Sequence, residues 1–398
     1  MAVDTGRATS IAAAQDRSWW RDERVRSIGS QVGAVAVIAL IIFYFAHNAS
    51  VNMARQGIAS GFGFLGREAG FGIGTTVIEY SPADTYGRAL VVGLLNTLLV
   101  SAIGCVLTTI FGTLLGIARL SSNWLLSKIT LWYVEVMRNT PVLLQLFVWW
   151  DVLRLGAPDK QNPLAILPHV YVSKAGLTFP VPVWHPIYLW MLAALLGGIL
   201  ATIVISRWAR QRQAATGKQF PVGWVGAALI VLAPAIVFLS AGAPLVLDVP
   251  VPGRFNFTGG GGIEPEFAAL LFGLVAYTSA FVAEIVRSGI QAVSWGQTEA
   301  AAALGLRRGQ SLRLVVLPQA IRVIIPPMTS EYLSFTKNSS LAVFIGFQEL
   351  TSIVNTTLNQ TGQAIEGITI LMAVYLTISL AISASMNVYN KYMALVER

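Results

Sequence analysis

Long apolar segments are the feature that most limits how this chain can fold. A helix needs about 20 predominantly apolar residues to cross roughly 30 Å of hydrocarbon, and several stretches of the sequence approach or exceed that length. Because a bilayer offers no water to backbone polar groups, such stretches are expected to be helical. We predict an all-α integral membrane protein with about eight transmembrane helices, at residues 28–46, 89–118, 139–155, 187–206, 222–241, 266–286, 323–347 and 366–389.

The composition supports this class. Hydrophobic residues form 55% of the 398 residues and charged residues only 12%, whereas a soluble domain has about 25% charged residues. The one cysteine, Cys105, excludes an intrachain disulfide, and the three histidines lie far apart in the sequence. We therefore expect neither a metal site nor a bound cofactor.

The net charge of +8 raises the question of nucleic acid, but the basic residues flank the apolar segments. In membrane proteins this placement indicates topology, because Lys and Arg are retained on the cytoplasmic side. With the N-terminus inside, 19 of the 27 basic residues lie in the cytoplasm and seven outside, and Lys337 falls within a span. We predict cytoplasmic termini and no nucleic-acid partner.

The loop at 290–320, between the sixth and seventh spans, has the most distinctive sequence. We expect Thr298 to cap a short helix, Glu299 to lie in its first turn and Gly305 to end it. Pro318 would then kink the chain before the next span. From composition alone, an amphipathic helix lying on lipid is an alternative.

The spacing of Glu299, Ala300, Ala301, Gly305 and Leu317-Pro318 resembles the EAA loop of ABC-importer permeases. In that family the loop forms a coupling helix that docks into a separate ATPase subunit. The resemblance therefore implies a role in ATPase coupling for a defined set of residues. They are Gly296, Glu299, Ala300, Ala301, Gly305, Leu306 and Pro318.

The flanking sequence resembles the polar amino-acid uptake branch of these permeases, and in particular the long-form subunit of general L-amino-acid transport systems. The resemblance implies a type I ABC-importer permease core with a two-helix insertion. The segments that show it are GLLNTL at 93–98, MRNTPVLLQ at 137–145, YTSAFVAEIVRSGI at 277–290 and TKNSSLA at 336–342.

This resemblance also predicts how the chain is divided. The insertion contains two spans and outer loops rich in Pro and Gly, in which Gly259–Gly262 is interpreted as a hinge. The expected parts are a cytoplasmic segment at 1–27, an anchor helix at 28–46, core residues 88–155, the insertion at 156–263, core residues 264–390 with the coupling loop, and a cytoplasmic tail at 391–398.

Charged residues inside predicted spans need partners or water. In the structural interpretation, Glu284 would pair with Arg287, and Glu331 would cap or brace a broken helix. Asp151 and Arg154, at the outer end of the third span, would form an interfacial pair or meet a docking protein. In the functional interpretation, a polar translocation path offers an acceptor for the ammonium and donors for the carboxylate of an amino acid. The candidates for that path are Glu331, Lys337, Asn338, Ser339 and Ser340.

From these motifs and this resemblance, we expect a permease subunit that translocates L-amino acids by alternating access, driven by partner ATPases. The chain has no G-x-x-x-x-G-K-[ST] motif and is not expected to be an enzyme. The resemblance implies ABC ATPases, a second permease in a heterodimer, a periplasmic binding protein and membrane lipid as partners, in the bacterial inner membrane. An ion-coupled secondary transporter of small polar solutes is the alternative.

Overall fold

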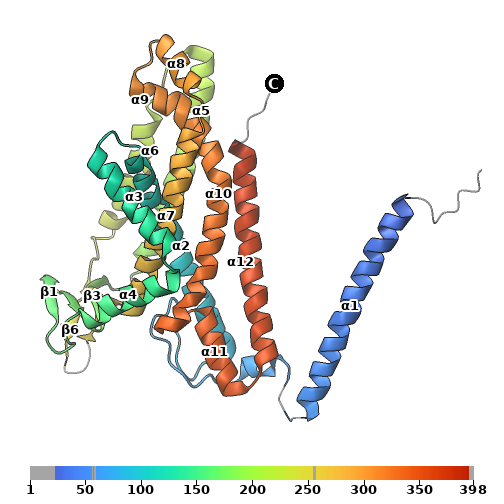
Figure 1. Cartoon of the computed structure of the whole chain (residues 1–398). Helices are drawn as coiled ribbons and strands as arrows, with labels where there is room; N and C mark the ends of the chain where they lie inside the picture. Colours follow the sequence, from blue (N-terminus) through green and yellow to red (C-terminus); the bar gives the residue numbers. More distant parts are fainter. Residues whose placement is uncertain (1–22, 56, 58–59, 254–256, 394–398) are drawn as a thin grey trace, which may run out of the picture.

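A computed structural model describes residues 23–55, 57, 60–253 and 257–393. Most of the predicted N-terminal segment and residues 394–398 of the predicted tail lie outside these ranges. The structure is mainly helical, as predicted (Figure 1). Its helices are α1 (Glu23–Arg55), α2 (Tyr86–Arg119), α3 (Trp124–Asn139), α4 (Val142–Leu155), α5 (Ile187–Thr216), α6 (Val222–Ser240), α7 (Pro265–Gln291), α8 (Trp295–Ala303), α9 (Arg308–Ser311), α10 (Leu317–Asn338), α11 (Leu350–Thr361) and α12 (Ala364–Met393).

Seven helical segments of the described ranges are long and apolar enough to cross a membrane. The difference from the eight predicted spans lies at 139–155, where α4 has only 14 residues. At about 1.5 Å per residue it measures roughly 21 Å, which is too short to cross alone. It follows the 16-residue α3 after a break at Thr140 and Pro141, because proline lacks the N–H that a continuous helix requires.

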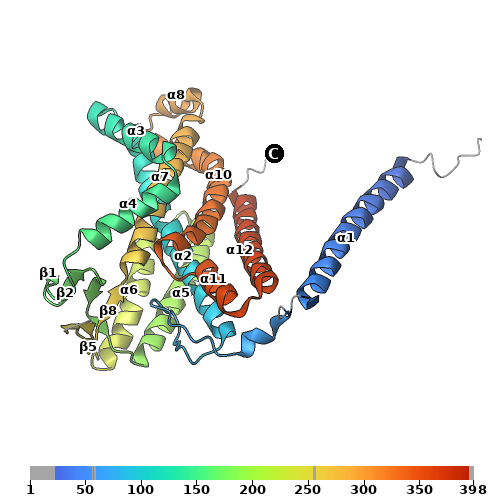
Figure 2. The same cartoon turned by 60° about the horizontal axis from the view of Figure 1, so that its bottom comes forward.

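The chain has two recognisable ends (Figure 1). Helices α8 and α9 lie at one end, called the loop end here, and the strands and α11 lie toward the opposite end, called the strand end. Helix α1 stands apart from the other helices in both ribbon views (Figures 1 and 2).

The core is built around α7, which packs against α2, α3, α4 and α10. Glycines in α2 allow close contact: a Cβ at Gly112 would collide with Val282 of α7, and one at Gly104 would overlap the ring of Phe335 in α10. The interior of this region is mainly apolar, although α2, α7 and α10 also bury hydroxyl side chains such as Thr108, Ser279 and Thr336. Its fully buried side chains include Val100, Leu146, Leu270, Leu274, Phe335 and Phe347.

A segment at 60–85, which includes a short 3₁₀ helix at Phe62–Gly66, crosses the strand end of this core. The amide of Gly61 donates to Glu366 at the start of α12. The side chain of Gln348 accepts from Gly74 N at 2.8 Å, and Asn96 of α2 donates to Thr75 O at 2.8 Å. The segment therefore connects α2 and α12 through backbone hydrogen bonds.

Glu349 forms a buried polar junction next to this segment. Its carboxylate accepts hydrogen bonds from Ser352 N at 3.0 Å, Tyr375 Oη at 3.0 Å and Thr97 Oγ1 at 3.3 Å. Burial raises the pKa of the Glu349 carboxyl. These hydrogen bonds link α2, α11 and α12. They also satisfy the carboxyl group, which would otherwise be costly to bury among apolar residues.

The predicted insertion forms a helical hairpin, α5 and α6, together with small sheets at the strand end (Figure 2). The strands were not predicted, and Gly259–Gly262 is not a hinge. Gly259 and Gly260 make a turn with positive φ, and Gly261 and Gly262 pair with β3. The strands are β1 (Leu164–Leu167), β2 (Val170–Ser173), β3 (Gly176–Phe179), β4 (Val181–Pro182), β5 (Leu247–Asp248), β6 (Val251–Pro252), β7 (Phe257–Thr258) and β8 (Gly261–Ile263), in the antiparallel orders β1-β2-β3-β8, β4-β5 and β6-β7.

We expect Gly104→Val to destabilise the protein by about 1–3 kcal/mol, because its side chain would force α2 away from Phe335. Gly197→Val is the matched control, since no atom lies within 4 Å of a Cβ placed there. The measurement is thermal unfolding of both variants in detergent. Equal melting temperatures for the two variants would contradict the described α2–α10 packing.

Candidate functional site

The predicted coupling loop contains a short helix, α8, which ends as the sequence indicates. Gly305 has φ of +76°, a conformation that glycine adopts without steric cost. Its amide donates to Ala302 O at 2.9 Å, and the amide of Leu306 donates to Ala301 O at 3.1 Å. These two bonds form a Schellman motif, which satisfies the last carbonyls of the helix and turns the chain sharply.

The start of α8 differs from the prediction. The helix begins at Trp295, so Thr298 lies inside it and Glu299 lies beyond its first turn. Ser294 precedes the helix but makes no side-chain capping bond. Thr298 was predicted as the cap because it precedes the alanine run, but the helical backbone extends one turn further toward the N-terminus.

Helix α8 exposes one face and buries another. Gly296, Glu299 and Ala300 are exposed, and Leu304 at the end of the helix is 82% exposed. Ala301, in contrast, is only 3% exposed. The side chain of Ala301 therefore faces the chain itself, whereas its predicted role in ATPase coupling stays a prediction. Its small size suits the side of the helix that packs against the chain.

After the turn at 304–307, the connection from α8 to the next span is helical. Helix α9 leads into a π-helical turn at Leu312–Val316, and Pro318 lies in the first turn of α10. Proline is tolerated there because the amides of the first turn have no partner within their own helix. Pro318 therefore follows an irregular helical turn at the base of α10.

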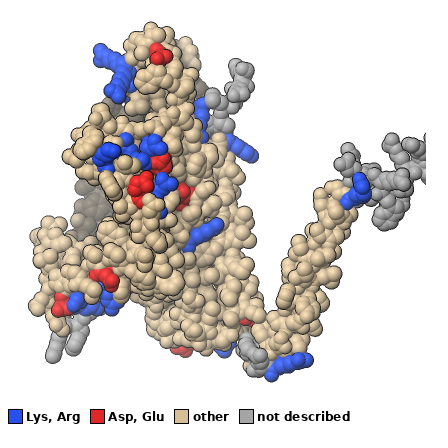
Figure 3. All heavy atoms as spheres, viewed as in Figure 1, with Lys and Arg blue, Asp and Glu red and all other residues tan. Residues whose placement is uncertain are grey.

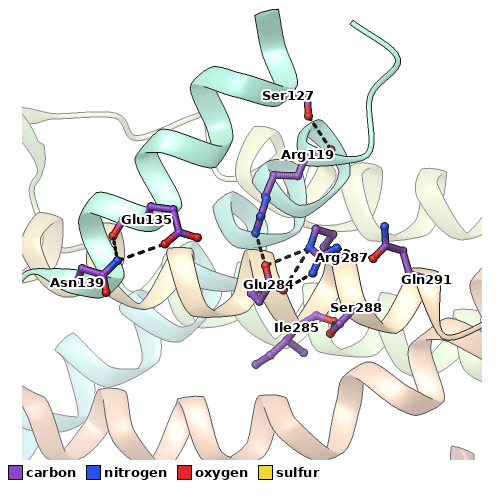
Figure 4. A network of polar contacts seen from close by, with 9 residues as sticks. All are labelled: Arg119, Ser127, Glu135, Asn139, Glu284, Ile285, Arg287, Ser288 and Gln291. Atoms are coloured by element: carbon purple, nitrogen blue, oxygen red, sulfur yellow. Dashed lines mark hydrogen bonds and ion pairs between the residues drawn. The ribbon is translucent and has the colours of Figure 1, made fainter. Parts of the chain in front are cut away.

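A charge cluster lies on α7, one to two turns before the coupling loop (Figure 4). Glu284 pairs with Arg287, as predicted, with Arg287 Nε 3.1 Å from Glu284 Oε2. It also pairs with Arg119, the last residue of α2, which was not predicted. Arg287 in turn donates to Gln291, the last residue of α7. The cluster therefore fastens the end of α2 to the segment that leads into α8.

The neighbouring surface of α3 carries further charge. The guanidinium of Arg138 lies 5.3 Å from the centre of the Phe281 ring in α7, within range of a cation–π interaction. Acidic and basic atoms gather over α3 and the adjacent part of α7, whereas most of the rest of this face carries no charge (Figure 3). The charged side chains on this surface of α3 and α7 would be costly to place in hydrocarbon.

The predicted interfacial pair of Asp151 and Arg154 is not formed. Arg154 approaches Glu266 of α7 at 3.7 Å, and its guanidinium lies 4.9 Å from the centre of the Trp150 ring. The sequence predicted Asp151 as its partner from their spacing of three residues. The approach of α7 supplies a different carboxylate, which local spacing could not show.

Helix α10 presents a polar, exposed stripe at Pro326, Pro327, Ser330, Ser334 and Lys337. The two prolines have no N–H, so the carbonyls four residues before them lack their usual helical partners. Serine and unpaired carbonyl groups are acceptors for a polar solute. Of this stripe, only Lys337 was predicted from the sequence, because the packing of α10 decides which of its sides is exposed.

Of the other predicted path residues, Glu331 lies beside the stripe, whereas Ser339 is buried in the core. Glu331 is half-buried next to the stripe, and neither it nor Lys337 has a side-chain hydrogen bond or ion pair to any residue that the structure describes. Ser339 is fully buried, and its hydroxyl donates to Thr336 O at 2.7 Å. Ser340 donates to Lys337 O at 2.7 Å, and Asn338 is partly buried. Ser339 therefore does not face the stripe.

Comparison with known proteins gives consistent matches. The family described as "Binding-protein-dependent transport system inner membrane component" matches residues 108–394. The "General L-amino acid transport system permease protein AapQ" of Rhizobium johnstonii is 49% identical over 96% of both chains. The "Putative amino-acid ABC transporter permease protein YhdX" of Escherichia coli is 45% identical over 94% of this chain and 95% of its own length.

A third relative has a longer substrate description in its name. The "Glutamate/glutamine/aspartate/asparagine transport system permease protein BztB" of Rhodobacter capsulatus is 42% identical over 95% of this chain and 96% of its own. Because these matches cover nearly the whole chain, they include most of the α5–α6 hairpin and the strands around it.

Neutralising either partner of the Arg119–Glu284 pair should destabilise the protein by about 1–2 kcal/mol, because the other charge would remain in a partly buried site. The double variant Arg119→Gln/Glu284→Gln should cost less than the sum of the two single variants. Thermal unfolding in detergent measures all three changes.

The control for this cycle is Lys174→Gln. It breaks the exposed pair between Lys174 and Asp159 and should cost less than about 1 kcal/mol. Strictly additive effects of the Arg119 and Glu284 substitutions would contradict a direct interaction between them.

Proposed function

The chain belongs to the binding-protein-dependent transport system inner membrane component family, and we propose from this premise how it takes part in amino-acid import. It is a permease subunit of an amino-acid ABC transporter, and ATP hydrolysis resides on a separate ATPase partner. A substrate-binding protein is the other partner that this family implies. An independent ion-coupled transporter is not favoured by these relatives.

The single observation that supports coupling most directly is the exposed face of α8. Gly296, Glu299 and Ala300 form a small-residue surface with one negative charge, held at a fixed angle by the Gly305 turn. Such a surface lets another protein approach closely. We assign ATPase docking to this face, with Leu306 and Pro318 holding the loop to α9 and α10.

Movement of α8 would then be passed on through α7. The two helices are separated by only three residues, Ala292–Ser294. Glu284 binds Arg119 and Arg287, so a displacement of α8 is opposed by α2 as well as by α7. Closure of the ATPases would thus move α2 and α7 together, instead of bending the end of α7 alone.

The substrate path is assigned to the exposed stripe of α10. An amino-acid zwitterion needs acceptors for its ammonium group, which Glu331 and the free carbonyls near Pro326 can supply. It also needs donors for its carboxylate, and Lys337 with Ser330 and Ser334 can provide them. The substrate class is L-amino acids, in line with the names of the full-length relatives.

A second permease subunit would cover this stripe. An exposed lysine and two serines on a membrane-spanning helix are poorly matched to lipid, and pairing of two permeases would enclose them around a central path. We propose a heterodimer, as the resemblance to long-form subunits implies. The complex would lie in the bacterial inner membrane, with the loop end and both termini in the cytoplasm.

Glu299→Lys should reduce ATP-driven uptake at least about tenfold while leaving membrane insertion intact, because it reverses the charge of the docking face. The measurement is uptake by the assembled transporter in liposomes, together with its ATPase rate. Ser122→Lys, at an exposed position between α2 and α3, is the control and should behave like the unmodified chain. Normal uptake by Glu299→Lys would refute the docking assignment.

Lys337→Met should weaken uptake about tenfold or more, since a charge-assisted hydrogen bond contributes about 1.5–3 kcal/mol. The basal ATPase rate should stay unchanged, because Lys337 lies far along the chain from α8. Lys391→Met makes the same chemical change in α12 and should leave uptake normal. Unchanged transport kinetics in Lys337→Met would rule out this path.

A further inference from the structure

Helix α5 is longer than its apolar part. It has 30 residues and measures about 45 Å, against roughly 30 Å of hydrocarbon. The apolar stretch ends near Ser206, and ten further helical residues, 207–216, follow at the loop end (Figure 1). This extension must therefore lie at or beyond the headgroup layer.

The extension is basic and has no acidic residue nearby in the sequence. Arg207, Arg210 and Arg212 lie on it, and Lys218 follows in the turn to α6, all four exposed. The sequence contains no Asp or Glu between residues 160 and 247. Among the described residues, no carboxylate forms an ion pair with any of these four cations.

Helix electrostatics do not account for these charges. Basic residues stabilise a helix through its dipole when they lie in the last turn, but the last turn of α5 contains none. The only buried residue of the extension is Ala209. At 100° per residue, Arg207 lies on the side of the helix opposite Ala209 and Arg210 lies on its flank, and both side chains are exposed.

Aromatic rings lie beside this basic surface. The guanidinium of Arg212 lies 5.2 Å from the centre of the Trp208 ring, and the Trp208 ring packs edge-on against Phe220 at 5.5 Å. Trp224 at the start of α6 is 83% exposed. Tryptophan residues with this exposure favour the interface between hydrocarbon and headgroups.

The hairpin is a tight unit with little attachment to the core. A Cβ at Gly198 would collide with the Leu229 carbonyl, and one at Gly226 with the Thr202 side chain, so α5 and α6 are in close contact. Apart from Gly198, Ala209 and Gly226, no described residue of either helix is buried. Contacts outside the described chain, such as lipid, must therefore hold the hairpin in place.

We propose that the loop end of the α5–α6 hairpin is a binding surface for anionic phospholipid headgroups, formed by Arg207, Arg210, Arg212 and Lys218. The lipid phosphates supply the negative charge that this part of the chain lacks, and lipid tails cover the apolar faces of the same hairpin. Juxtamembrane clusters of this size attract anionic lipid electrostatically. The bound lipids thus anchor the hairpin beside the permease core.

The test is native mass spectrometry of the assembled transporter, titrated in mild detergent with phosphatidylglycerol or phosphatidylcholine. The unmodified chain should retain phosphatidylglycerol about tenfold better. The variant Arg207→Gln/Arg210→Gln/Arg212→Gln/Lys218→Gln should lose most of this preference. Its uptake in liposomes should also no longer increase when phosphatidylglycerol is added.

The matched control is Arg207→Lys/Arg210→Lys/Arg212→Lys, which keeps the charge and should keep the lipid preference. An unchanged preference in the neutral variant would overturn the proposal. So would loss of the ATPase subunit from the neutral variant with lipid retention unaltered, because the surface would then bind protein. Loss of the preference in the lysine variant would contradict its electrostatic origin.

Discussion

The close contact between α2 and α7 is the interaction on which the rest of the structure depends. Gly112 and Gly116 bring α2 against Val282 and Val286, where any larger residue would collide. Membrane helices have little hydrophobic drive to associate, so small residues and polar pairs decide which helices meet. One turn further on, the pair of Arg119 and Glu284 closes the same contact. Close packing and an ion pair thus both hold α2 against α7 along the same contact.

This contact gives α7 its place between the two ends of the molecule. At the strand end, Glu264 precedes α7 and accepts a hydrogen bond from Thr75, in the segment that crosses the core. At the loop end, α7 leads directly into α8. A permease without an ATPase of its own must receive force at one end and change access along its length, and a helix clamped on α2 is suited to this.

Much of the fold could be predicted from sequence because membrane spans depend on local composition. The end of α8 was also predictable from local sequence, because only glycine readily adopts the backbone conformation of residue 305. The pair of Glu284 with Arg287 follows from helical spacing. Contacts between distant segments were missed: Arg119 lies 165 residues before Glu284, and Glu266 replaced Asp151 as the partner of Arg154. The short strands also pair across distant segments, as β3 does with β8.

The candidate substrate path was also only partly predictable, because it depends on how α10 packs against distant segments. Lys337 and Glu331 were identified because charges are rare in spans, whereas Ser330 and Ser334 became candidates only when the packing of α10 showed its exposed side. Ser339, adjacent to the path candidates in sequence, points into the core. A helix places neighbours in sequence on different faces, so a run of polar residues cannot line one path.

We expect this chain to transport amino acids only as part of an ATP-driven assembly. The most direct measurement is purification of the tagged chain from its native membranes in mild detergent, followed by identification of every retained protein and reconstitution in liposomes. We expect recovery of an ATPase and a second permease, and uptake that requires ATP and the binding protein. A chain that purifies alone and transports on an ion gradient without ATP would contradict this expectation.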